Sequence, residues 1–171
     1  MITWTVVRVV ASIVVVTALY YLLPFDRSTS GVAVTLLVAG LVVFVGLVAF
    51  QVRAIIASPF PGLRAIEALA TSVPLFLVLF ASSYFVMARL SPGSFSAPLT
   101  RTDALYFTVT VFSTVGFGDI TPKTETARLV VTGQMIADLV ILGLAIKAIV
   151  GAVRRGRQRR PQAADHAQLT E

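Results

Sequence analysis

Three apolar runs, at residues 32–50, 68–88 and 129–150, are long enough, or nearly so, to cross the hydrocarbon core of a membrane. A helix rises about 1.5 Å per residue, so about 20 apolar residues span that core. The composition agrees, because 57% of the residues are hydrophobic, only 13% are charged, and the mean hydropathy is +0.89. A soluble enzyme or a disordered chain carries far less apolar surface, so the fold class we expect is an all-α integral membrane protein.

Catalytic signatures are missing from the sequence. The chain has no cysteine, which excludes disulfides, thiolate metal sites and a cysteine nucleophile. No nucleophile–base pair, metal-ligand cluster or phosphate-binding loop stands out among the other residues. We therefore expect no enzymatic activity and no organic cofactor.

A shorter apolar run at residues 9–23 precedes the three long ones, and we interpret it as the first of four transmembrane helices. A cleaved signal peptide is the alternative interpretation. It fits less well, because Pro24 and Phe25 stand where a small-residue cleavage site is expected.

The distribution of Lys and Arg predicts that both termini are cytoplasmic. In that orientation the inside holds nine basic residues, namely Arg8, Arg53, Arg64, Lys147, Arg154, Arg155, Arg157, Arg159 and Arg160. The outside holds five, namely Arg27, Arg89, Arg101, Lys123 and Arg128. We therefore expect a multi-pass protein of the plasma membrane, in which residues 1–51 form two peripheral transmembrane helices and residues 52–67 a cytoplasmic linker.

The segment between the last two long runs faces outward and carries the informative sequence. Residues 91–102 are rich in Ser and Pro and predict a surface turret. A short apolar helix over residues 103–113 follows, capped by Thr102 or Thr100, with Asp103 favoured in its first turn by the helix dipole. Eleven residues of helix reach only about 16 Å, so this segment is expected to enter the membrane and turn back.

The filter segment, residues 114–119, comes next, with the sequence Thr114, Val115, Gly116, Phe117, Gly118 and Asp119. Potassium must exchange its water shell for a cage of oxygens, which backbone carbonyls can supply. Carbonyls of an extended strand alternate in direction, and pointing them the same way requires alternating backbone handedness. Gly116 and Gly118 meet that need, because positive φ is cheap mainly for glycine. One chain offers one oxygen per layer, so four chains would complete each cage.

The filter segment resembles the selectivity-filter signature of the bacterial potassium channel family, and the resemblance extends over about residues 68–150. It implies a homotetrameric pore module at residues 68–151, built from an outer helix, a re-entrant pore helix, the filter and an inner helix. It also implies that K⁺ ions bind Thr114, Val115, Gly116 and Phe117.

Two positions depart from the family pattern. Phe117 stands where tyrosine is commoner and lacks its hydroxyl, and Thr110 replaces an acidic residue found in some bacterial members. The resemblance nevertheless implies that Gly118, Asp119, Tyr106 and Thr110 support the filter. Tyr106 occupies the position of a family tryptophan that bonds the final aspartate.

The inner helix, residues 129–150, contains a carboxylate at membrane depth, Asp138, which is costly unless it faces water or a partner. Two interpretations stay open. The four aspartates concentrate cations below the filter or bind the back of the pore helix, or else Asp138 is protonated or bonds Gln134 or a neighbouring helix to hold the tetramer together. The predicted cavity and gate residues are Gln134, Asp138, Leu139, Leu142, Gly143 and Ile146.

The tail, residues 152–171, is basic and is expected to be disordered. Its arginines (Arg154, Arg155, Arg157, Arg159 and Arg160) fix the topology in one interpretation and bind anionic lipid headgroups in the other. Nucleic-acid binding is not expected, because no aromatic platform accompanies these arginines. No span carries regularly spaced arginines, so we expect no voltage sensor. About twenty residues follow the inner helix, too few for a ligand-binding domain, so none is expected there.

The function predicted from the sequence is passive, potassium-selective conduction through a tetrameric pore. A weakly selective cation channel and a non-conducting membrane subunit are the alternatives. The sequence does not identify the gating stimulus or the role of the first two spans.

Overall fold

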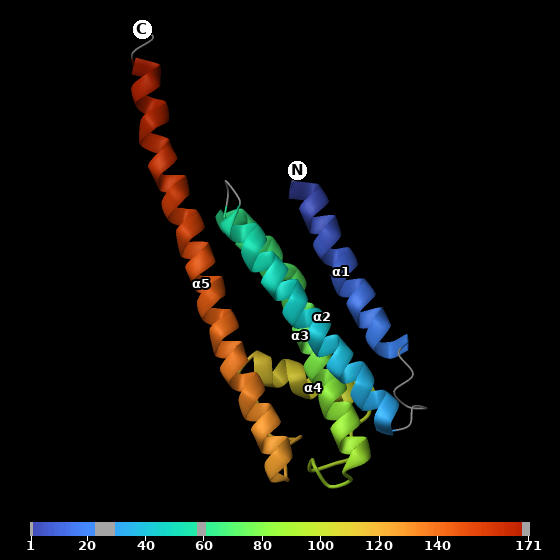
Figure 1. Ribbon diagram of the computed structural model, residues 1–171. Helices are drawn as coiled ribbons and strands as arrows, with labels where there is room; N and C mark the ends of the chain where they lie inside the picture. The colour runs from blue at the N-terminus through green and yellow to red at the C-terminus, as the bar shows by residue number, and fades with distance from the viewer. Residues whose placement is uncertain (1, 23–29, 58–60, 169–171) are drawn as a thin grey trace.

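The computed structural model describes residues 2–22, 30–57 and 61–168, with side chains described only as far as residue 151. Within these ranges the chain is helical except in the loops on either side of its shortest helix. The helices are α1 (Ile2–Leu22), α2 (Ser30–Ile56), α3 (Pro61–Leu90), α4 (Arg101–Phe112) and α5 (Glu125–Gln168). Figure 1 shows α4 as the short helix lying across the others, and α5 extending beyond them to the C-terminus.

Three of the described helices are long and apolar enough to cross a membrane, which confirms the three long runs. The spans are Gly31–Ile55 in α2, Arg64–Leu90 in α3 and Glu125–Lys147 in α5. The first helix contributes only a shorter apolar stretch, Ile13–Leu22, so the fourth span remains a prediction.

Both segments that the sequence assigns to the cytoplasm are more helical than expected. The linker is shorter than residues 52–67, because α2 continues to Ile56 and α3 begins at Pro61, a residue favoured in the first helical turn. The tail is helical through Gln168 rather than irregular. Alanine and glutamine, both good helix formers, predominate over residues 162–168.

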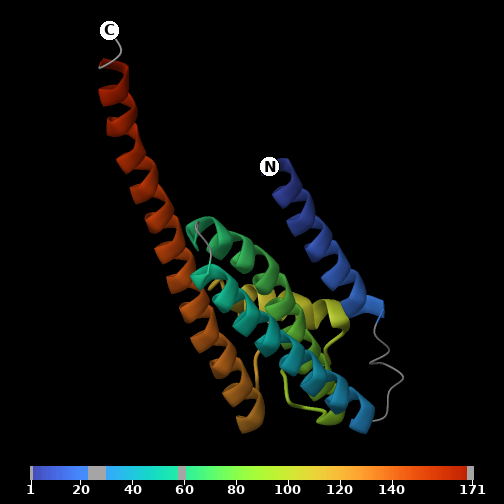
Figure 2. The same ribbon diagram turned by 45° about the horizontal axis from the view of Figure 1, so that its top comes forward.

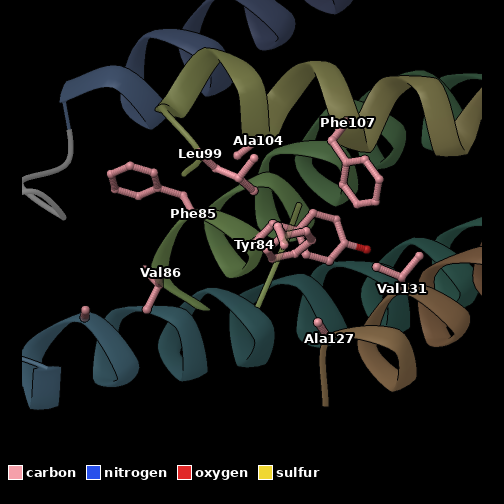
Figure 3. Close-up of a cluster of buried hydrophobic side chains, with 10 residues drawn as sticks. Tyr84, Phe85, Val86, Leu99, Ala104, Phe107, Ala127 and Val131 are labelled. Atoms are coloured by element: carbon pink, nitrogen blue, oxygen red, sulfur yellow. The ribbon is translucent and has the colours of Figure 1, made fainter. Parts of the chain in front are cut away.

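The centre of the fold is α3, which packs against each of the other four helices. In both views α1 lies on the far side of α2 and α3 from α5 (Figures 1 and 2). The buried cluster around α3 is built on the rings of Tyr84, Phe95 and Phe107, whose centroids lie 5.2–5.8 Å apart with edge-on contacts. Figure 3 shows the Tyr84 ring inside this cluster, with its hydroxyl directed toward Val131 on α5.

The predicted surface turret at residues 91–102 is wrong in part, because Ser94, Phe95 and Leu99 are buried. The ring of Phe95 completes the aromatic cluster described above, so burial of an apolar side chain draws this loop onto the core.

Candidate functional site

The pore helix expected from the sequence is α4, a 12-residue helix whose N-terminus has a capping box. Its N-cap is Thr100, one of the two predicted caps. The Thr100 side chain accepts from the Asp103 backbone N–H, while the Asp103 carboxylate accepts from the Thr100 backbone N–H at 2.9 Å. The hydrogen bonds from the Thr100 hydroxyl and backbone hold the pKa of Asp103 below its ordinary value. At about 1.5 Å per residue the helix is too short to cross a membrane.

The filter segment has alternating backbone handedness. Gly116 and Gly118 have φ values of 52° and 78°, which confirms the positive φ predicted for both glycines. Thr114 also has a positive φ, of 59°, although it is not a glycine. Every second residue from 114 to 118 is therefore in the left-handed region, the arrangement that turns consecutive carbonyls toward one side.

Backbone hydrogen bonds tie the start of the filter segment to the end of α4. The Thr110 carbonyl accepts from the backbone N–H groups of Val115 at 3.1 Å and Gly116 at 3.2 Å. The Thr114 N–H is likewise donated to α4, to the Val111 carbonyl at 3.0 Å. Because three consecutive N–H groups point back at the helix, their positive ends are turned away from a cation on the other side. The buried Thr110 contributes to the site through its backbone, a role its side chain did not reveal.

Side chains of the filter segment are exposed in the single chain, with Val115 at 56% and Phe117 at 70%. The Phe117 ring stacks on the Tyr106 ring at a centroid distance of 6.3 Å and an interplanar angle of 9°. Partial desolvation, followed by a hydrogen bond and the negative charge of Asp119, raises the pKa of the Tyr106 phenol. Tyr106 therefore lies against both Phe117 and Asp119.

The turret holds the far end of the filter segment, a contact the sequence analysis missed. A single antiparallel bridge pairs Phe95 with Pro122. Next to it, Ser96 donates its backbone N–H to the Thr121 carbonyl at 2.9 Å, and its hydroxyl to the Asp119 carbonyl at 3.3 Å. The two paired segments are separated by the whole of α4 and the filter segment, so no local sequence pattern predicts the pairing.

A buried polar network joins α3, α4 and α5 behind the filter segment. The Tyr84 hydroxyl donates to Gln134 Oε1 at 2.6 Å, and Gln134 Nε2 donates to the Thr108 carbonyl at 3.1 Å. The same Nε2 donates to Asp138 Oδ2 at 3.3 Å. Gln134 and Asp138 are 0% and 6% exposed, so within one chain both face the pore helix and α3 rather than an open surface. The bond between Asp138 and Gln134 agrees with the structural interpretation, and it is Gln134, through the Thr108 carbonyl, that contacts the back of the pore helix.

The remaining predicted gate residues lie on another face of α5. Leu139, Leu142 and Ile146 are each more than half exposed. A side chain added at Gly143 would meet nothing within 4 Å, so this glycine does not mark close packing inside the chain. The side chains of the basic tail, from Arg154 to Arg160, lie outside the described residues.

Residues 72–155 match the protein family described as "Ion channel". The curated proteins similar to the chain include three potassium channels. The voltage-gated potassium channel Kch of Escherichia coli (strain K12) is 34% identical over 79 residues, which cover 46% of the chain and 19% of Kch. Two-pore potassium channel 4 of Arabidopsis thaliana is 38% identical over 69 residues, or 33% of the chain and 24% of that protein.

The third relative is potassium channel protein kcv of Paramecium bursaria Chlorella virus 1, which is 36% identical over 78 residues. This match covers 40% of the chain and 83% of the viral protein. The chain thus spans about a fifth to a quarter of the first two relatives but most of the viral one. No solved structure matches the chain.

Proposed function

We propose, from the premise that this chain belongs to the potassium channel family, that it conducts K⁺ passively and selectively across the plasma membrane as a homotetramer. The observation that carries the proposal is the alternation of positive φ at residues 114, 116 and 118, directly behind a half-length helix. Carbonyls aligned in this way replace the hydration shell of a potassium ion. The coordinating residues are Thr114, Val115, Gly116 and Phe117.

Assembly follows from what one chain leaves uncovered. All residues from 113 to 119 are exposed in the single chain, with carbonyls that lipid could not satisfy. Copies arranged around an axis would cover this strip and turn it toward a shared aqueous path. Four copies supply the oxygens that each ion layer needs.

The orientation is part of the same proposal. With α1 as a fourth span and both termini cytoplasmic, the turret and the filter exit face outward. The basic residues 154–160 then lie at the inner leaflet, where each cationic side chain contributes about 1 kcal/mol of attraction to anionic headgroups. Ion conduction on this scheme needs no organic cofactor and no catalytic group.

Reconstitution into vesicles with a potassium gradient tests the proposal. The parent protein is expected to pass K⁺, and Gly116→Ala to abolish the flux, because an L-residue at φ 52° is strained and displaces the carbonyls. Gly93→Ala is the matched control. Gly93 also has a positive φ, of 90°, but lies outside residues 114–119, and a side chain added there would meet nothing within 4 Å, so the same kind of strain should leave K⁺ flux intact.

Three outcomes separate the proposal from its alternatives. Potassium flux without sodium flux supports it. Equal fluxes of both ions indicate a weakly selective cation channel, and no flux of either ion indicates a non-conducting subunit.

A further inference from the structure

The C-terminal end of α1 meets the first turn of α4, although the two segments are about eighty residues apart in the chain. The Tyr20 hydroxyl donates to the Arg101 carbonyl at 2.6 Å, and the Arg101 guanidinium donates back to the Tyr20 carbonyl. Tyr20 is completely buried in spite of its position at the end of a peripheral helix. The contact is therefore reciprocal and partly buried, unlike the packing of apolar side chains that lipid could equally cover.

The charge on Arg101 explains why its guanidinium bonds α1 and not its own helix, α4. A cation in the first turn of a helix opposes that helix's dipole, so Arg101 is poorly placed with respect to α4 alone. Its guanidinium instead reaches a carbonyl in the last turn of α1, where a cation is favoured and carbonyls lack helical partners. The guanidinium carbon also lies 5.9 Å from the Tyr20 ring centroid and 5.3 Å from that of Phe85 on α3. Three helices thus meet at one arginine.

A second, weaker contact lies beside the first. Tyr21 Oη and Thr102 Oγ1 are 3.3 Å apart at an exposed position. Consecutive tyrosines at the end of α1 therefore reach consecutive residues at the start of α4.

The other end of α4 holds the filter segment, because the Thr110 carbonyl accepts from both Val115 and Gly116. Arg101 and Thr110 lie in the first and last turns of the same 12-residue helix, so a tilt of α4 as a whole displaces both. A contact that restrains the first turn of α4 therefore also restrains the end that bonds Val115 and Gly116.

We propose that Tyr20 and Arg101 form a latch by which α1 holds the pore helix in the orientation that keeps the filter conducting. The effect on K⁺ current rests on the proposed function. The effect on the stability of α4 does not. Tyr20 and Arg101 are positioning residues, and α1 becomes a control element for the pore as well as a membrane anchor.

The first test does not depend on conduction. Amide hydrogen exchange is measured in the reconstituted full chain for the peptide that covers Arg101–Phe112. Tyr20→Phe keeps the ring over Arg101 but removes the hydroxyl, and exchange is expected to rise about three- to tenfold, the opening that corresponds to one lost hydrogen bond. Leu19→Ala is the control, because Leu19 lies one residue away, is 53% exposed, and should leave exchange unchanged. Unchanged exchange in Tyr20→Phe would overturn the latch.

The second test is electrical. Potassium current through Tyr20→Phe and through Arg101→Gln is expected to decline about three- to tenfold faster than in the parent, and the double variant no faster than the worse single one. Raising external K⁺ should slow the decline, because an ion that binds the conducting filter shifts the equilibrium toward it. A merely structural weakening would not depend on K⁺. Additive effects, or a decline insensitive to K⁺, would contradict the latch.

The two tests also separate this inference from the function on which it rests. Faster exchange in Tyr20→Phe together with a parent protein that passes no K⁺ would retain the latch and reject the channel. Normal K⁺ current with unchanged exchange and unchanged current decline would do the reverse.

Discussion

The filter segment is decided by single residues and their backbone handedness. Gly116 and Gly118 occupy positive φ at little cost, whereas Thr114 does so as a β-branched residue. Strain of this kind persists only where neighbouring contacts hold it, and the hydrogen bonds of Val115 and Gly116 to the Thr110 carbonyl supply that restraint. The conformation is thus imposed from α4 and does not arise from the segment alone.

Phe117 is the residue at which we expect the clearest change in gating. Its ring stacks on Tyr106 but carries no hydroxyl to bond the surrounding pore helix. Phe117→Tyr adds a donor there, and single-channel recordings are expected to show longer openings as the filter becomes more stable. Val109→Ala, on the exposed face of the same helix, serves as the control. Open times that stay the same in Phe117→Tyr would reject the idea that the missing hydroxyl weakens the filter.

Asp103 gives the N-terminus of α4 a defined response to acid. Hydrogen bonds from Thr100 lower its pKa, so the carboxylate stabilises the fold above its unfolded pKa, and this contribution is lost as the pH falls through the lowered folded value. The melting temperature of the parent is therefore expected to fall as the pH drops through that acidic range. The melting temperature of Asp103→Asn should be lower than that of the parent at neutral pH and should change less with pH. Parallel pH profiles for the two proteins would contradict this assignment.

At the scale of elements, the sequence predicted what depends on local pattern. The three long apolar runs and the half-length helix follow from hydrophobic pattern, and capping rules narrow the N-cap to Thr102 or Thr100, of which the structure has Thr100. Contacts between distant elements were not predictable in the same way. The pairing of Phe95 with Pro122 and the bond between Tyr84 and Gln134 depend on packing that brings separate segments together.

The direction in which the Asp138 side chain points also could not be predicted from the sequence. Helical spacing placed it near Gln134, but a period of about 3.6 residues cannot say which face meets the pore helix and which meets the cavity. The structure supplies that choice through the Gln134 bonds to Thr108 and Asp138.

Asp138→Asn tests the role of this network between helices. Because Asp138 is only 6% exposed and bonds Gln134, the substitution is expected to leave internal block by multivalent cations unchanged while shifting the thermal melting of the assembly. Tyr84→Phe offers a comparison, since it strands Gln134 Oε1 at a cost of about 1–3 kcal/mol in unfolding free energy. A clear loss of block in Asp138→Asn would instead show that the carboxylate faces the ion path.

At the scale of the whole molecule, one chain has the parts of a pore but not the pore itself. The filter segment and the Leu139–Leu142–Ile146 face of α5 are exposed, so both need other copies, water or lipid to cover them. On the opposite side, α1 contacts α4 through Tyr20 and Arg101 and lies across α3 from α5 (Figure 2). This arrangement places α1 beside the first turn of α4 and leaves the filter segment uncovered, as the proposed tetramer requires.

The reversal potential across a bilayer with potassium on one side and sodium on the other tests this account most directly. Carbonyl cages matched to potassium predict a reversal potential displaced strongly toward the value at which potassium alone is at equilibrium. A reversal potential near zero in the parent protein, with measurable current, would show that sodium passes equally well and would contradict the account.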